Sequence, residues 1–189
     1  MALTTRRIAI AVMLALSAAA CQTEDKKAEP RFVSDARPAF ENKDSRYFIE
    51  FRSRYALSYG HSYVIFGRAD QAGGMIDPEV AGLAPATAST APYVLGHFLP
   101  VPAETGASDG DLEEAYRSAS WRVMLTEAQY GKTVAHIRQL KAKSKFWQAS
   151  IYNCNAFVAD IARSMGYKAP SIWLRPQQFI TQLREMNAG

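Results

Sequence analysis

Four stretches in the first two thirds of the chain alternate or mix aliphatic, aromatic and polar residues in short runs, and each predicts a β-strand. Between the second and third strands, residues 77–91 are rich in Ala, Pro, Gly, Ser and Thr, which indicates an extended excursion without regular structure. A loop near Gly106 then leads into a short helix around residues 112–117. The four predicted strands are "YFIEFRSR" at 47–54, "HSYVIFGR" at 61–68, "PYVLGHFLP" at 92–100 and "SWRVMLT" at 120–126.

The last third of the chain has helical periodicity. Thr126 and Gln129 have the spacing of a capping box, and they predict a helix over residues 127–143. A second helix follows Asn153, which suits the N-cap position, and it ends before Gly166. A third begins near Pro176, because proline favours the first helical position. The buried stripes of the three helices are predicted to be Tyr130, Val134, Ile137 and Leu140; Phe157, Val158, Ile161 and Met165; and Phe179, Ile180, Leu183 and Met186.

Strands come first and helices later, without regular alternation, and this order is typical of an α+β fold. We see no internal repeat and no second hydrophobic pattern that would require another domain. The sequence therefore predicts one α+β domain over residues 46–189, with an antiparallel sheet packed against helices.

The N-terminus has a different pattern. Arg6 and Arg7 precede the apolar run 8–20, which is shorter than the roughly 20 residues that span a bilayer as a helix. A positive start, a short apolar run and small residues before Cys21 resemble a bacterial lipoprotein signal. We therefore expect residues 1–20 to be a signal peptide and Cys21 to carry lipid, with a plain secretory signal cut near Ala20 as the alternative. Residues 21–45 are the lipidated cysteine and a polar tether.

Composition excludes several classes of partner. The formal net charge of the chain is +4, and it falls to +2 when residues 1–20 are removed. No basic run with interleaved aromatic residues suggests nucleic acid. Neither a metal-ligand motif nor a phosphate-binding loop is present, so we expect no metal and no cofactor. We expect a monomeric, lipid-anchored protein that faces the periplasm. Because Gln22 follows Cys21, we expect the outer membrane, not the inner membrane, to hold the anchor.

Cys154 is the second of only two cysteines, so it has no partner in the chain if Cys21 carries lipid. It stands at the start of a predicted helix, where unpaired N–H groups and the helix dipole stabilise a thiolate. No acidic residue falls in that first turn. Two other interpretations stay open: a buried, inert cysteine and an intermolecular disulfide.

A reactive thiol needs a base beside it, and the chain has three histidines. His136 falls mid-helix, beside the apolar stripe, and we expect it to be an exposed or boundary residue. His61 opens the second predicted strand after Gly60, and His97 lies in the third. Spacing alone does not choose between His61 and His97.

The blocks "GHSYVIFG" and, about ninety residues later, "YNCNAFVADIARSMG" resemble circularly permuted papain-like cysteine enzymes of the NlpC-type superfamily. This branch includes the PPPDE peptidases and the lecithin retinol acyltransferase-like enzymes, in which a strand histidine precedes the catalytic cysteine. The "NCN" of residues 153–155 is closest to the PPPDE form. The resemblance implies a papain-like, circularly permuted domain.

The resemblance also implies roles for residues. Cys154 would be the nucleophile and His61 the general base. The backbone N–H of Cys154 would help to hold the oxyanion, next to the cap residue Asn153. A third polar group commonly orients the histidine, and His97 is the candidate for it. The implied function is a Cys–His amidase or peptidase, with peptidoglycan peptides as candidate substrates, or an acyltransferase. The alternative is a non-catalytic envelope lipoprotein that uses the same fold as a binding or scaffolding module.

Overall fold

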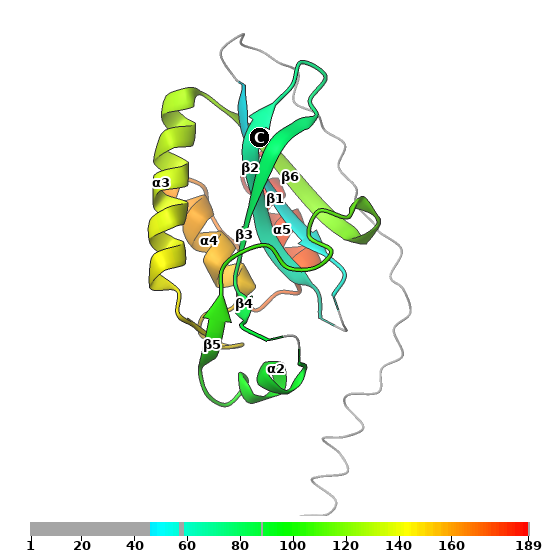
Figure 1. Ribbon diagram of the computed structural model, residues 1–189, viewed down its shortest axis with the longest axis vertical. Helices are drawn as coiled ribbons and strands as arrows, with labels where there is room; N and C mark the ends of the chain where they lie inside the picture. The colour runs from blue at the N-terminus through cyan, green and yellow to red at the C-terminus, as the bar shows by residue number, and fades with distance from the viewer. Residues whose placement is uncertain (1–45, 57–58, 88, 189) are drawn as a thin grey trace, which may run out of the picture.

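The computed structural model describes residues 46–56, 59–87 and 89–188. Its central sheet has four antiparallel strands in the order β3-β2-β1-β6 (Figure 1). A smaller sheet, in the order β4-β5-β7, lies at the lower end of the view. The strands are β1 Tyr47–Arg54, β2 His61–Ala69, β3 Met75–Gly82, β4 Ala84–Pro85, β5 Val101–Glu104, β6 Arg117–Leu125 and β7 Phe146–Trp147.

Helices pack against one face of the central sheet. α4 lies over β2 and α5 lies over β6 and β1, while α3 packs beside α4 (Figure 1). This arrangement confirms the α+β class and the antiparallel sheet packed against helices. The helices are α2 Ala91–Leu95, α3 Glu127–Lys143, α4 Cys154–Ser164 and α5 Pro176–Glu185, and a 3₁₀ turn, η1, spans Glu114–Tyr116.

The three long helices begin where the sequence predicts. Thr126 and Gln129 form the capping box of α3 with both reciprocal hydrogen bonds. Asn153 caps α4, and Gly166 just beyond α4 has a φ of 87°, a conformation that favours glycine. Met186 differs from the prediction, because it follows the last turn of α5 and is 45% exposed.

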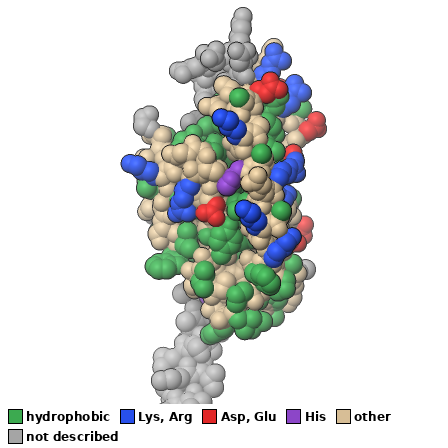
Figure 2. Space-filling model, turned by 90° about the vertical axis from the view of Figure 1, so that its left-hand side faces the viewer, with side chains coloured by type: hydrophobic (Ala, Val, Ile, Leu, Met, Phe, Trp, Pro, Cys, Tyr) green, Lys and Arg blue, Asp and Glu red, His purple; other side chains and the backbone are tan. Residues whose placement is uncertain are grey.

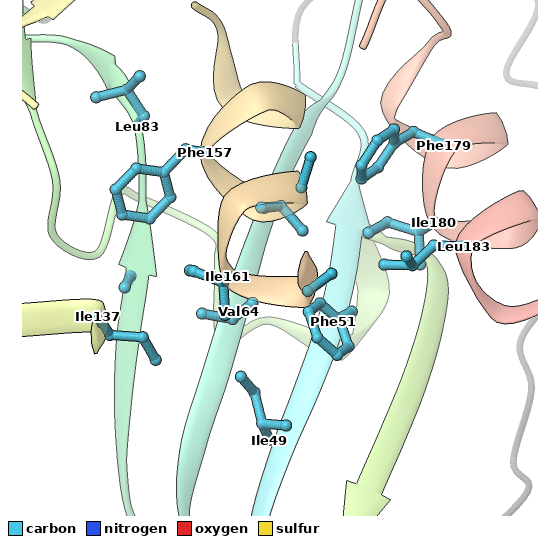
Figure 3. Packing of buried hydrophobic residues seen from close by; sticks show 14 of the residues in the cluster. Ile49, Phe51, Val64, Leu83, Ile137, Phe157, Ile161, Phe179, Ile180 and Leu183 are labelled. Carbon is cyan, nitrogen blue, oxygen red and sulfur yellow. The ribbon is translucent and has the colours of Figure 1, made fainter. Parts of the chain in front are cut away.

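Successive side chains along β1 and β2 point to opposite faces of the sheet, so the buried residues of these strands are divided between the two faces. On the helix side, the core joins strand residues to α4, α5 and α3 (Figure 3). The opposite side has a second, smaller core around Phe48, Tyr63 and Ile65. The helix-side residues include Ile49, Phe51, Val64, Phe157, Ile161, Phe179, Ile180 and Leu183.

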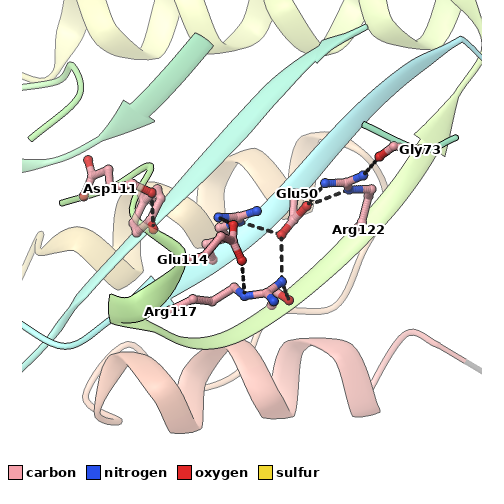
Figure 4. Close-up of polar contacts among 9 residues, drawn as sticks. Glu50, Gly73, Asp111, Glu114, Arg117 and Arg122 are labelled. Atoms are coloured by element: carbon pink, nitrogen blue, oxygen red, sulfur yellow. Dashed lines mark hydrogen bonds and ion pairs between the residues drawn. The ribbon is translucent and has the colours of Figure 1, made fainter. Parts of the chain in front are cut away.

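The second face also buries charge (Figure 4). The Glu50 carboxylate is 2% exposed and accepts from Arg52 at 2.5 Å and from Arg122 at 2.6 Å. Arg52 also donates to Glu114 at 2.6 Å. Since a buried charge is tolerated only when it is paired, this network fixes the turn that carries Glu114 against the sheet.

Two predictions between the second and fourth strands are wrong, and a third holds only in part. Residues 92–100 do not form a strand: α2 spans Ala91–Leu95 and turns follow, because this segment packs Gly96 and Tyr93 against Trp147 instead of pairing in the sheet. Residues 77–91 contain most of β3, which pairs with β2 in spite of Pro78. Proline is accommodated there because β3 is an edge strand. The helix predicted around residues 112–117 is only the short turn η1.

The predicted signal peptide (1–20), the lipidation site Cys21 and the tether (22–45) lie outside the described residues. Within the described part of the chain, no helix combines the length and the hydrophobicity that crossing a bilayer requires.

Candidate active site

Asn153 and Cys154 place a thiol at the first residue of α4. The Asn153 side-chain oxygen accepts from the Ala156 N–H at 3.0 Å, which is the N-cap bond predicted from the sequence. The Asn153 amide nitrogen donates to the Ala149 and Ile172 carbonyls at 2.8 and 3.1 Å. These bonds join the segments before and after α4. Since the amide already donates to two carbonyls, Asn153 acts as a cap and a tie, and the oxyanion would be held by backbone N–H groups.

Asn155, the second asparagine of the "NCN" block, is fully buried and ties β2 to α4. Its side-chain oxygen accepts from the Ser62 hydroxyl at 2.8 Å, and its amide nitrogen donates to the carbonyls of Ile172 and Leu174 at 3.1 and 2.7 Å. The start of β2 is therefore held against the start of α4. No role for Asn155 follows from its spacing in the sequence, although an asparagine within the buried part of an apolar helix is a signal that points to a buried hydrogen bond.

The Cys154 thiol is free and 5% exposed. Burial raises its pKa, while the Ser62 hydroxyl and the backbone N–H groups of Ser62, Asn155 and Cys154 oppose that shift. Burial is the largest of these effects, so the resting group is a neutral thiol. The groups that oppose the shift are those that would stabilise negative charge on the sulfur or on an adjacent oxyanion.

His61 stands next to Ser62 at the first residue of β2 and is 8% exposed. Its imidazole stacks on Tyr63 with ring centroids 5.6 Å apart. A Cβ atom added to Gly82 would lie only 2.8 Å from its Nε2. Burial, with a smaller contribution from the Arg54 cation, lowers the pKa of His61 to about 4, against the opposing effect of the Asp111 carboxylate. The imidazole is therefore neutral at physiological pH, in the form that accepts a proton.

The two candidate residues lie on either side of Ser62. Ser62 faces α4 and the sulfur, whereas His61 stacks on Tyr63, which belongs to the core of the other face. Among the described residues, no hydrogen bond joins the imidazole of His61 to Cys154. The fold thus brings the two residues to the same end of the sheet, but on opposite faces of β2.

Asp111 is the acidic group near His61, and sequence reasoning missed it. Its carboxylate is 1% exposed and accepts from Arg54 at 2.6 Å and from the Ser108 N–H at 2.8 Å. Its carbonyl oxygen accepts from the Tyr63 hydroxyl at 2.6 Å (Figure 4). The loop carrying Asp111 lies about fifty residues from β2 in sequence, so no local pattern connects the two. The charge of Asp111 acts on His61 and raises its pKa, although no hydrogen bond joins the two side chains among the described residues.

His97 lies in the turn that follows α2, not in a strand, and it is exposed. Its backbone N–H donates to the Val94 carbonyl at 3.2 Å, and its own carbonyl accepts a 3.5 Å hydrogen bond from the Gln148 side chain. Nothing in the described residues joins its imidazole to His61. His136 is half-buried on α3, in agreement with the boundary position predicted for it. Its Nε2 has no hydrogen-bond partner among the described residues.

In the described part of the chain, no three His, Cys, Asp or Glu side chains gather as they would around a metal ion. No family model, curated protein or solved structure matches the chain.

Proposed function

We propose that this chain is a lipid-anchored protein of the cell envelope, with a circularly permuted papain-like domain, that acts as a hydrolase or acyltransferase through Cys154. Two features support this proposal: a free thiol at the first residue of a capped helix, and a neutral histidine at the start of the strand tied to that helix through Ser62 and Asn155. The single observation that carries it is the 2.8 Å bond between Ser62 and Asn155, which holds the two candidate residues at one end of the molecule.

The chemistry would proceed as follows. His61 takes the proton of the Cys154 thiol, and the thiolate attacks the carbonyl carbon of an amide or ester. Backbone N–H groups at the start of α4 stabilise the oxyanion. The imidazolium returns its proton to the leaving amine or alcohol, and a thioester remains on Cys154. Water or a second acceptor then attacks the thioester and regenerates the thiol.

His61 must move for this to happen, since its ring now rests over Gly82. The strand begins at His61, and the preceding Gly60 has a φ of 98°, so the chain enters the strand through a residue that tolerates backbone rotation. In its new position the imidazole must meet the sulfur, and the Asp111 carboxylate would stabilise the cation that forms.

The present placement of His61 also favours the second candidate, a non-catalytic binding or scaffolding module on the same fold. The observation behind it is that His61 and the sulfur occupy opposite faces of β2. In that case Cys154 would be an inert, buried thiol.

The test is covalent capture on the full-length chain. The chain is incubated with an activated acyl ester and, separately, with a peptidoglycan stem peptide, and acylation of Cys154 is located by peptide mass spectrometry. The catalytic proposal expects a thioester on Cys154. His61→Gln should slow its formation by about 10²–10⁴-fold, whereas His97→Gln should leave the rate unchanged. If the unaltered chain forms no thioester on Cys154, the binding module is the correct interpretation. If His61→Gln acylates at the rate of the unaltered chain, His61 is not the base.

A further inference from the structure

One end of the molecule exposes an unusual number of large hydrophobic side chains. Seven of the twelve exposed large hydrophobic residues in the described part of the chain come from three segments at this end, 94–99, 146–151 and 171–174. Figure 2 shows hydrophobic side chains gathered at the lower end of the molecule, over the region of α2, with basic side chains above them. We call these residues the apolar tip: Val94, Leu95, Phe98, Leu99, Phe146, Ile151 and Trp173.

Hydrogen bonds hold the three segments together. The Ala149 N–H donates to the Gly96 carbonyl at 3.0 Å, and the Trp173 indole N–H donates to the Ser150 carbonyl at 2.9 Å. Asn153, the residue before Cys154, donates to the carbonyls of Ala149 and Ile172. The tip is therefore a fixed surface built around the start of α4, and it is not a set of scattered hydrophobic residues.

The apolar tip has few charged or unsatisfied polar groups that would have to enter an apolar phase. Phe98 and Trp173 are 81% and 74% exposed, and the indole N–H of Trp173 is already satisfied within the protein. Residues 80–103 and 146–159 contain no Asp, Glu, Lys or Arg. Exposed cations flank the tip instead: Lys143 and Lys145 precede Phe146, and Arg175 follows Leu174.

We infer that the apolar tip docks on the surface of a lipid bilayer that contains anionic lipids. Exposed aromatic and aliphatic side chains bordered by Lys and Arg are the composition of interfacial membrane-binding surfaces, and tryptophan prefers the level of the headgroups. The flanking cations attract the negative surface. A second copy of the chain is the competing occupant, but the cations would then face each other across the interface. The inference does not rest on the thiol chemistry. If that chemistry holds, the docked tip brings the start of α4, where Cys154 lies, close to the bilayer surface.

The test uses the full-length chain carrying Cys21→Ser, which cannot be lipidated, and vesicles of phosphatidylcholine and phosphatidylglycerol with brominated acyl chains. Bromine quenches tryptophan at close range, so the readout is local to Trp173 even if residues 8–20 also enter the bilayer. Trp173→Phe identifies the part of the signal that comes from this residue. We expect Trp173 to be quenched, and quenching to weaken in phosphatidylcholine alone or in high salt.

Phe98→Asp or Ile151→Asp should lower vesicle affinity by about ten- to a hundredfold, the equivalent of one large hydrophobic side chain removed from the bilayer. Met186→Asp is the matched control, because Met186 is also exposed but lies beyond the end of α5. Circular dichroism and the Tm of each variant establish that it is folded. Absence of Trp173 quenching, or equal affinity for Phe98→Asp and Met186→Asp, would overturn the inference. So would sedimentation equilibrium showing a dimer that Phe98→Asp dissociates, which would assign the tip to a second copy.

Discussion

The Ser62 hydroxyl donates a 2.8 Å hydrogen bond to the side-chain oxygen of Asn155, and both residues are fully buried. This contact joins positions 93 residues apart in the sequence and fixes β2 against α4. Ser62 follows His61 and Asn155 follows Cys154, so one hydrogen bond positions the two candidate residues of the site.

We predict that Asn155→Ala lowers the free energy of unfolding by about 2–4 kcal/mol. It leaves the buried Ser62 hydroxyl without its acceptor and removes one of the two side-chain donors to each of the Ile172 and Leu174 carbonyls. Ser62→Ala removes only one bond and should cost about 1–2 kcal/mol. Urea unfolding of both variants and of the double variant measures the coupling between the two residues. A loss for Asn155→Ala no larger than that for Ser62→Ala would show that the bonds to residues 172–174 contribute little.

Local patterns in the sequence were sufficient for the elements whose stability is local. The capping box of α3, the N-cap of α4 and the proline at the start of α5 each lie within one turn of the helix that they start, so their signals are readable without tertiary information. The alternation in β1 and β2 is equally local.

The segment from Met75 to Val101 was not predictable in this way. β3 contains Pro78 and a residue with positive φ, Asp77, and it is a strand only because β2 offers an edge to pair with. Residues 92–100 have the composition of a strand, but contact with Trp147 holds them as α2 and turns. In both places, long-range packing overrides local propensity.

The candidate site also has a part that local sequence patterns predict and a part that they do not. Cys154 and Asn153 were placed correctly because a helix start is a local feature. The surroundings of His61 depend on Asp111 and Arg54, which come from a distant loop and a neighbouring strand, and no spacing in the sequence relates them to His61. The face of the sheet on which His61 lies also follows from the register of β2 with β1, where it pairs with Arg54.

Glu50 is the centre of the buried charge network, and we predict that Glu50→Ala costs about 3–5 kcal/mol of unfolding free energy. The reason is that Arg52, which is 2% exposed, loses its nearest carboxylate and Arg122 loses its partner. Glu79→Ala breaks the exposed 2.6 Å ion pair between Glu79 and Arg138, and it should lower the free energy of unfolding by no more than about 1 kcal/mol. Thermal or urea unfolding compares the two variants. Similar losses in both would mean that burial of the Glu50 network has little energetic consequence.

The His61 imidazole should make the protein sensitive to acid. Its pKa is about 4 in the folded chain and ordinarily 6.5, so the folded state binds fewer protons than the unfolded state between these values. The contribution of the neutral His61 imidazole to the free energy of unfolding is therefore fully present above pH 6.5. It is lost as the pH falls toward 4, and the loss is at most about 3 kcal/mol.

His61→Gln should remove this part of the pH dependence, and His97→Gln, at an exposed position, serves as the matched control. Urea unfolding measured at several pH values between 4 and 7 provides the comparison. If the free energy of unfolding of His61→Gln depends on pH as it does in the unaltered chain, the acid sensitivity comes from other groups.

Gly82 determines where the His61 ring can rest. A Cβ at this position would lie 2.8 Å from Nε2 of His61 and 3.1 Å from Cβ of Tyr63, so Gly82→Ala must displace the imidazole from its place over β3. We predict a loss of about 1–3 kcal/mol in unfolding free energy from the forced repacking. If His61 works as a base by leaving this position, the same change should speed acylation of Cys154, because it destabilises the resting place of the ring.

Gly131→Ala is the matched glycine substitution. Gly131 lies inside α3, and a Cβ there would meet nothing within 4 Å. Alanine favours the helix over glycine by about 1 kcal/mol, so this variant should be more stable than the unaltered chain by that amount and should leave the acylation rate unchanged. Parallel measurements of unfolding and of Cys154 acylation distinguish the two glycines. A Gly82→Ala chain that loses stability without any change in acylation would indicate that Gly82 serves packing alone and that the ring over β3 does not limit the chemistry.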